Sequence, residues 1–301
     1  MKIAILGAPG CVGRNLIKRL LDSSQHSITA SYRVKEEIPD AIRHESLNWK
    51  QVNLLDKSST EEFLKDSEVL IYLVHSLDAT NYAKIDAQLA AAAALGAKNT
   101  GIRKIIYLGG IIPEGKKLSP HLASRKRTGQ ILASYNVNVA EVRASILLAT
   151  CSASFLLVYY LARRLPVLVT PRWINSLCAP IALEDAVSFI EALVPYNLSG
   201  HEIFEVGSNA VRYQDLITLC SKYIRGYKNI VIPFPFLSVG IASRWLHVLT
   251  GVPRNVGMAL SEGLKNNTLP QNNQFREIMG REPIAVESTL QRLVEEMREK
   301  R

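Results

Sequence analysis

Three glycines stand at regular spacing directly after the first apolar run of the chain. Residues 3–6 are Ile-Ala-Ile-Leu, and a helix-like segment, residues 12–21, follows the turn. Because glycine has no Cβ, backbone amides in such a turn can approach a pyrophosphate at a helix N-terminus. The spacing G-x-x-G-x-x-G departs from G-x-G-x-x-G but keeps a glycine at each end. The residues predicted to bind a dinucleotide here are Gly7, Ala8, Pro9, Gly10, Cys11, Val12, Gly13 and Arg14.

The residue at the end of the second predicted strand indicates which dinucleotide is bound. An acidic residue about twenty positions beyond the last glycine normally holds the ribose hydroxyl of NAD. Arg33 stands there instead, and Arg14 follows the last glycine. Two guanidinium groups could bind a 2′-phosphate, so the sequence favours NADP(H) over NAD(H).

Short β-branched runs alternate with helix-like segments as far as about residue 145. The predicted strands are residues 3–7, 27–32, 49–53, 68–74, 104–109 and 137–142, and the predicted helices are 12–21, 59–64, 81–98 and 119–134. This alternation predicts an α/β fold, a Rossmann-type doubly wound parallel sheet. Ser119 and Pro120 are typical of a helix start.

The second half of the chain follows a different pattern. Prolines interrupt shorter elements after residue 145, with a helix expected from Arg212, a strand at 230–233 and a closing helix at 286–300. We expect two parts: an NAD(P)-binding domain at 1–145 and a smaller C-terminal α+β lobe for a substrate or a partner at 146–301.

Several segments after the predicted strands resemble the atypical and extended short-chain dehydrogenase/reductase (SDR) group, in particular its NmrA-like and epimerase-like members. They are residues 53–56 (Asn-Leu-Leu-Asp), 73–76 (Leu-Val-His-Ser), 107–110 (Tyr-Leu-Gly-Gly) and 180–186 (Pro-Ile-Ala-Leu-Glu-Asp-Ala). The resemblance implies that the chain returns to the main sheet at about 174–194. It adds these residues to the cofactor site: Leu55 and Asp56 beside the adenine, Leu73, Val74 and His75 along the cofactor, and Gly109 and Gly110.

The catalytic Tyr-x-x-x-Lys pair of that superfamily is missing. Its positions fall on His121 and Arg125, and its serine falls near Gly109 or Gly110. Two interpretations remain open. His121 could donate a proton, since imidazole titrates near neutrality, while Arg125 holds the ribose or a substrate anion. Alternatively, the helix only positions the cofactor and partners.

Other polar residues could contact a substrate at the carboxyl edge of the sheet, where open α/β sheets bind their ligands. An arginine beside an indole could cap a flat or anionic substrate, although a structural Trp with a surface Arg is the more ordinary explanation. The candidate substrate residues are Ser76, Tyr82, Glu114, Arg143, Arg172 and Trp173.

Composition and charge limit the partners. The net charge of +9 favours anionic partners, but the basic residues are dispersed and no basic arm with aromatics appears, so nucleic acid is not expected. The four cysteines form no C-x-x-C pair, so we predict neither a disulfide framework nor a metal site and expect a reducing, cytoplasmic setting. The apolar run 146–162 is interpreted as a strand end, a turn and a buried helix, with no membrane span.

Two functions fit these observations. One is an NADP(H)-dependent oxidoreductase acting on a small organic molecule. The other is a non-catalytic redox sensor or assembly factor that binds NADP(H), which the missing catalytic pair favours. A sugar-nucleotide epimerase would need the missing tyrosine. A homodimer or a partner protein is compatible with either function.

Overall fold

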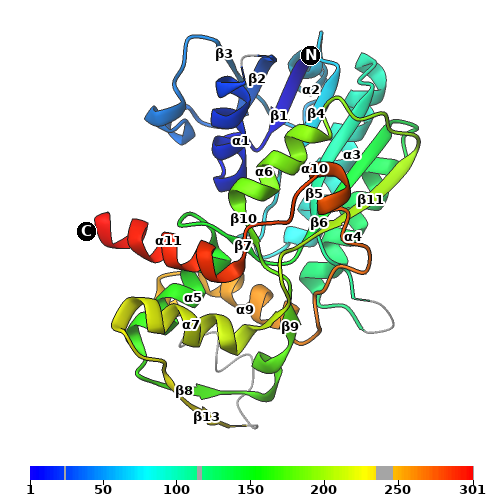
Figure 1. Ribbon diagram of the computed structural model, residues 1–301. Coiled ribbons are helices and arrows are strands. Elements are labelled where there is room, and N and C mark those ends of the chain that lie inside the picture. Colours follow the sequence, from blue (N-terminus) through cyan, green and yellow to red (C-terminus); the bar gives the residue numbers. More distant parts are fainter. Residues whose placement is uncertain (24, 114–116, 235–246, 301) are drawn as a thin grey trace.

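Seven parallel strands form the main sheet of the chain, for which a computed structural model describes residues 1–23, 25–113, 117–234 and 247–300. The strands lie in the order β11-β6-β5-β4-β1-β2-β3 (Figure 1). Their bounds are β1 Lys2–Leu6, β2 Ser27–Tyr32, β3 Leu47–Gln51, β4 Val69–Tyr72, β5 Lys104–Gly110, β6 Asn138–Ala144 and β11 His201–Val206. The order from β3 to β6 is that of a doubly wound Rossmann sheet, which confirms the predicted fold class.

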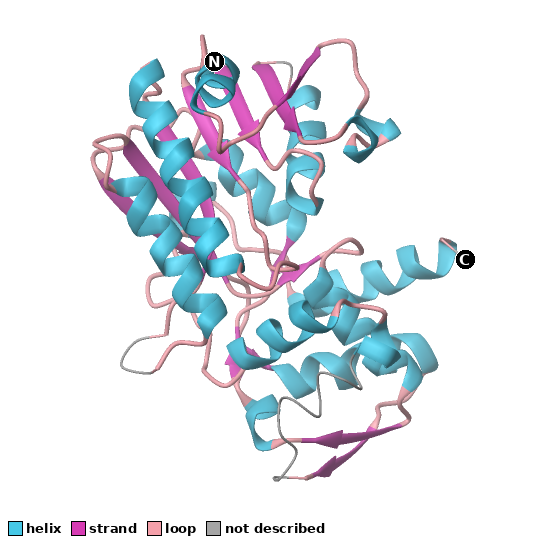
Figure 2. Ribbon diagram, turned by 180° about the vertical axis from the view of Figure 1, so that it is seen from behind, coloured by secondary structure: helices cyan, strands magenta, loops and turns pink. Residues whose placement is uncertain are grey.

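Helices cover both faces of this sheet because successive side chains of each strand point to opposite sides. Ile3 and Ile5 belong to the core under α1 and α6, whereas Ala4 and Leu6 belong to the core on the opposite side. Figure 2 shows the covering helices from behind. The covering helices are α1 (Cys11–Asp22), α2 (Lys57–Leu64), α3 (Tyr82–Thr100), α4 (Pro120–Ala133) and α6 (Leu183–Ala192).

A second group of helices surrounds a third core. Phe155, Ile217 and Leu290 are fully buried there. The helices are α5 (Ala153–Arg164), α7 (Tyr213–Arg225), α9 (Arg254–Gly263) and α11 (Val286–Glu299), while α10 (Phe275–Met279) packs against α6. Three strand pairs complete the fold: β7 (Leu147–Leu148) with β10 (Ile181–Ala182), β9 (Leu177–Cys178) with β12 (Val211–Arg212), and β8 (Val167–Thr170) with β13 (Ile230–Pro233).

The apolar run 146–162 has the structure expected from its sequence. It comprises β7, a turn and most of α5, and the Ser152 side chain caps the helix by accepting a hydrogen bond from the Phe155 amide at 3.3 Å. Among the described residues, none of the helices has the length and apolar character needed to cross a bilayer.

Strand β11 was not among the predicted strands because polar residues interrupt its apolar pattern. Its buried Glu205 accepts a hydrogen bond from the Gln271 amide at 2.7 Å and lies 3.9 Å from the Arg143 guanidinium. His201 contacts the buried Glu141 carboxylate of β6 at 2.8 Å. These polar partners compensate for the burial of carboxylates that sequence patterns alone would place at the surface.

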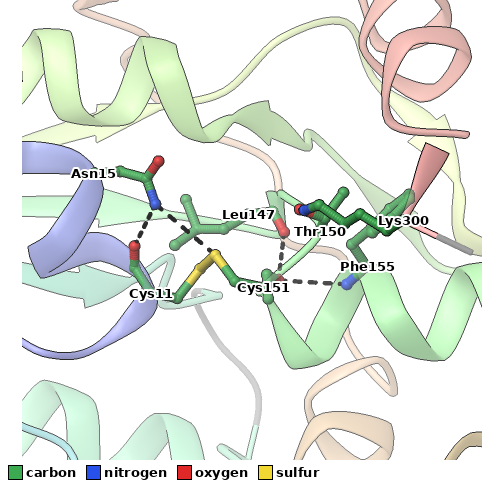
Figure 3. The surroundings of a disulfide bond; sticks show 8 residues. Cys11, Asn15, Leu147, Thr150, Cys151, Phe155 and Lys300 are labelled. Carbon is green, nitrogen blue, oxygen red and sulfur yellow. Dashed lines mark hydrogen bonds between the residues drawn. A yellow bond between two sulfur atoms is a disulfide. The ribbon is translucent and has the colours of Figure 1, made fainter. Parts of the chain in front are cut away.

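A disulfide joins Cys11 and Cys151, so the prediction of no disulfide was wrong (Figure 3). The two residues are 140 positions apart, and their Cα atoms lie 5.5 Å from each other. The α/β topology brings the first residue of α1 and the turn before α5 together, which sequence spacing could not reveal. The expectation of a reducing setting loses its basis. Cys178 and Cys220 are buried free thiols, and burial raises the pKa of each to about 12.

Removing the cross-link should lower stability. A disulfide that closes a loop of this length constrains the unfolded chain by roughly 4–5 kcal/mol in the loop-entropy account. We therefore expect Cys151→Ser to lower the melting temperature, measured by circular dichroism. A dithiol reductant should lower the wild-type melting temperature to that of the variant and leave the variant unchanged. An unaltered wild-type melting temperature after complete thiol release would contradict a stabilising disulfide.

Candidate functional site

The glycine turn brings the backbone of α1 against the end of β1. Gly7 has a φ of +82°, and a Cβ there would lie 3.0 Å from the Leu73 carbonyl. A Cβ on Gly13 would lie 2.5 Å from the Ala8 carbonyl oxygen, far closer than atoms can approach. Gly10 is the N-cap of α1 and accepts a hydrogen bond from the Arg14 amide at 3.0 Å. The amides of the first helical turn therefore lie at the carboxyl edge of the sheet, as anion binding requires.

The loops after β2 and β4 border the same turn. The Ser31 hydroxyl accepts a hydrogen bond from the Gly7 amide at 3.1 Å. The backbone of Leu73 and Val74 lies against Gly7. The structure thus brings three of the predicted cofactor segments together: the turn itself, the end of β2 and the end of β4.

Residues predicted near the adenine lie after β3. The Asp56 side chain caps α2 by accepting a hydrogen bond from the Ser59 amide at 3.2 Å. This contact occupies one carboxylate oxygen. Leu55 is 64% exposed, which leaves an apolar side chain available to a flat base.

Arg33 lies beyond the end of β2 with a largely exposed side chain. Its guanidinium is 2.8 Å from the Glu37 carboxylate, and its amide donates to the same carboxylate at 3.2 Å. An ion pair this exposed contributes little free energy, so the guanidinium could exchange Glu37 for an anionic ligand at low cost.

Two histidines and one carboxylate meet near the ends of β4 and β5. The His75 and His121 ring centroids are 5.4 Å apart. His75 Nδ1 lies 3.2 Å from an Asp86 carboxylate oxygen, and the other oxygen accepts a hydrogen bond from the Ser76 amide at 2.9 Å. The Ser124 hydroxyl, one turn along α4 from His121, is 3.5 Å from the same carboxylate. Asp86 therefore fixes the loop after β4 and the orientation of the His75 ring.

The surroundings keep both imidazoles neutral at physiological pH. Burial, with the nearby His75 and Arg125, lowers the pKa of His121 to about 3. Burial also lowers the pKa of His75, although the hydrogen bond with Asp86 opposes this shift. Burial alone would raise the pKa of Asp86, but hydrogen bonds from His75 and Ser76 outweigh it and lower the pKa. The site therefore contains one carboxylate and two neutral rings.

Among the described residues, one buried ring nitrogen of His121 is unpaired. Within the described part of the chain, its buried Nδ1 has no hydrogen-bond partner. A buried polar atom without a partner costs free energy, and a catalytic role is one explanation for such an atom. The ring lies at the start of α4, where the Ser119 side chain caps the helix as the sequence predicted.

Arg125 is engaged with β5. Its guanidinium donates to the Leu108 carbonyl and lies 5.0 Å from the centre of the Tyr107 ring. The Tyr107 hydroxyl in turn donates to the Arg125 carbonyl at 3.1 Å. These contacts hold the cation at Leu108, the residue before Gly109 and Gly110 at the end of β5.

Sequence reasoning did not identify Asp86. Its side chain is 3% exposed and lies on the face of α3 that also buries Ala90, Ala93 and Ala97. A carboxylate at helical spacing from three buried alanines must be paired. This pattern in the sequence could have revealed it.

The other candidate substrate residues have varied environments. The Arg143 guanidinium forms ion pairs with the carboxylates of Glu141 at 2.7 Å and Glu205 at 3.9 Å, so it links β6 to β11. Tyr82 begins α3, and burial beside Glu262 raises its pKa. Glu114 and the side chains of Arg172 and Trp173 lie outside the described residues.

Comparison with known proteins agrees with this geometry. Residues 7–151 match the model of the NAD(P)H-binding family. No curated protein sequence gives a significant match to the chain.

Three solved structures share the fold over nearly the whole length of both chains. A triphenylmethane reductase from Citrobacter sp. has a TM-score of 0.79 and 16% identity, and covers 98% of this chain and 100% of its own. A nucleoside-diphosphate-sugar epimerase from Staphylococcus aureus has a TM-score of 0.78 and 15% identity, with coverages of 97% and 100%. The NADPH-dependent quinone oxidoreductase QOR2 of Escherichia coli has a TM-score of 0.76 and 17% identity, with coverages of 97% and 99%.

These findings concern the fold and the cofactor class. Residues 7–151 match the NAD(P)H-binding family, and the whole chain shares its Rossmann-type fold with the three solved structures. The match supports NAD(P)H binding by this part of the chain.

The low pKa of His121 makes stability depend on pH. Its ordinary pKa is 6.5 and its folded value is about 3, so the unfolded chain binds more protons between these values and stability falls as the pH falls through this range. The loss at about pH 5, relative to neutral pH, is about 2 kcal/mol. We expect His121→Phe to reduce the pH-dependent loss by that amount, measured by urea unfolding at both pH values. The control is His44→Phe, which removes an exposed imidazole and should lose as much stability at about pH 5 as the wild type does. If His121→Phe also lost as much stability as the wild type, a depressed pKa of His121 would be contradicted.

Proposed function

We propose that the chain is an NADP(H)-dependent reductase acting on a small organic molecule with a carbonyl or quinone oxygen. The observation that carries this proposal is the neutral, buried His121, whose Nδ1 has no partner among the described residues. Its ring is 5.4 Å from His75, which follows the segment lying against the glycine turn. A polar group that could contact the substrate therefore lies at the edge of the sheet where the cofactor binds.

Separate groups of residues would then bind the cofactor and contact the substrate. The glycine turn would bind the pyrophosphate, and Leu55 would lie against the adenine. The bound cofactor would supply the hydride, and water would supply the proton to the reduced oxygen. A neutral imidazole can donate an N–H hydrogen bond to a substrate oxygen on which negative charge develops, so His121 would polarise that oxygen. Asp86 would hold His75 beside it and thereby fix the polar edge of the site.

The preference for NADP(H) rests on Arg33. A guanidinium bound to a 2′-phosphate typically contributes a charge-assisted hydrogen bond that NADH cannot make. We expect Arg33→Ala to weaken NADPH binding roughly tenfold or more while NADH binding stays within about twofold, measured by calorimetry. Arg43→Ala is a matched control, because Arg43 also forms an exposed ion pair, with Asp40 at 3.1 Å. Equal weakening of both cofactors in Arg33→Ala would refute this role for Arg33.

Measurements of substrate turnover test the proposed reductase activity. NADPH oxidation should be followed with a panel of quinones, enones and aldehydes. For the substrate found, we expect His121→Phe to lower kcat by about 10²–10³-fold, the usual contribution of a hydrogen-bond donor to a developing oxyanion, with NADPH affinity nearly unchanged. His44→Phe controls for loss of an exposed imidazole. Gly10→Asp should abolish NADPH binding, since aspartate suits an N-cap and preserves the helix but places a carboxylate at the pyrophosphate.

The alternative is a non-catalytic protein that binds NADP(H) and senses redox state or assists assembly. Tight NADPH binding with no turnover across the panel would favour it. Turnover that His121→Phe leaves unchanged would retain the reductase but remove His121 from its mechanism.

A further inference from the structure

The ribbon formed by β8 and β13 carries an apolar outer face. The strands pair in parallel, with Val167 opposite Ile230 and Val169 opposite Ile232. Leu168, between the two valines, is buried on the inner face. Alternation along a strand therefore places the two aliphatic pairs on the same outward side. The exposed fractions are 38% for Val167, 49% for Val169, 65% for Ile230 and 49% for Ile232.

The apolar face extends beyond the paired residues. Phe234, 47% exposed, continues β13 and donates its amide to the Thr170 carbonyl at 2.7 Å. Tyr227, 57% exposed, lies at the opposite end. The solvent side of a two-stranded ribbon usually carries polar residues, and a contiguous apolar surface marks a site of interaction.

Basic residues border the end of the ribbon at which both strands begin. Arg164 ends α5, three residues before Val167, and Lys228 precedes Ile230 by two; both are exposed. The Ile230 amide donates to the Pro166 carbonyl at 2.9 Å, so these two strand starts adjoin. The Arg225 guanidinium lies 5.1 Å from the centre of the Tyr227 ring. Cations and an aromatic ring thus form one border of the apolar face.

The distribution of acidic residues reinforces this pattern. Segments 142–183 and 216–261, which contain both strands of the ribbon, α5 and most of α7, carry nine Lys and Arg residues and no Asp or Glu. The parts of the chain next to the ribbon are therefore basic, although the lobe as a whole also contains many acidic residues.

The ribbon is also well placed for docking. Both views show β8 and β13 at the end of the molecule opposite the seven-stranded sheet (Figures 1 and 2). A flat surface could approach this end without contacting the NAD(P)H-binding domain.

We propose that the outer face of β8 and β13 docks on an anionic lipid bilayer. The aliphatic side chains enter the boundary between headgroups and acyl chains, Tyr227 lies at the headgroup level, and Arg164 and Lys228 face lipid phosphates. A nucleic acid does not fit, because the outer face offers aliphatic side chains where base or phosphate recognition needs hydrogen-bond donors. The face lies on the bilayer surface, and no helix among the described residues is long and apolar enough to cross it.

Vesicle co-sedimentation tests this proposal with the full chain. We expect binding to phosphatidylcholine vesicles containing about a third phosphatidylglycerol, much weaker binding to pure phosphatidylcholine, and release at high salt. Ile230→Thr/Ile232→Thr keeps β-branching but should weaken binding at least tenfold. Ile203→Thr, at an isoleucine 40% exposed on β11, is the matched control and should bind like the wild type.

A charge reversal tests the electrostatic contribution to vesicle binding. Lys228→Glu should weaken vesicle binding about fivefold or more, whereas Lys98→Glu on α3 should have little effect. Melting temperatures confirm that each variant is folded. Absence of wild-type binding to anionic vesicles, or equal binding by the threonine double variant, overturns the proposal. A vesicle-free dimer that Ile230→Thr/Ile232→Thr converts to a monomer, seen by analytical ultracentrifugation, also overturns it and assigns the face to a second copy of the chain.

Discussion

The close approach of α1 to the end of β1 is the contact on which the cofactor site depends. At Gly13 there is no room for a Cβ, because the Ala8 carbonyl oxygen would lie 2.5 Å away. The helix can therefore begin directly at the sheet edge, with its first amides facing the space beyond β1. The positive φ of Gly7 turns the chain into this position and allows the backbone of Leu73 to pack against it. Two glycines thus set both the helix position and the position of the β4 loop.

The same junction connects the two halves of the chain. Cys11, the first residue of α1, is bonded to Cys151 just before α5, and the Asn15 side chain donates to the Cys11 carbonyl at 2.7 Å (Figure 3). The glycine turn is therefore covalently linked to the start of the segment that leads into the helices around the third core. A shift of α5 would be transmitted to the turn, because a disulfide restricts the separation of the two Cα atoms.

Local patterns in the sequence were sufficient to predict most of the main sheet and its helices. The six predicted strands are present because apolar or β-branched residues recur in each, and the start of α4 followed from Ser119 and Pro120. Long-range features were not predictable in this way. Strand β11 contacts β6 through the Arg143–Glu205 ion pair and through the polar contact of His201 with Glu141, and the disulfide joins residues whose proximity arises only from the topology. In the candidate site, the glycine turn was evident, whereas Asp86 lay hidden in an alanine-rich helix.

The neighbouring His121 and Arg125 determine the electrostatics of the candidate site. In a Tyr-x-x-x-Lys pair, the cation lowers the pKa of the phenol and so makes its proton easier to transfer. An arginine beside an imidazole acts in the opposite sense, because its positive charge disfavours the protonated ring. Arg125 and burial together keep His121 neutral, and Asp86 holds the neighbouring His75 in place without charging it. The arrangement suits a hydrogen-bond donor that polarises a substrate oxygen, and not an acid that transfers a stored proton.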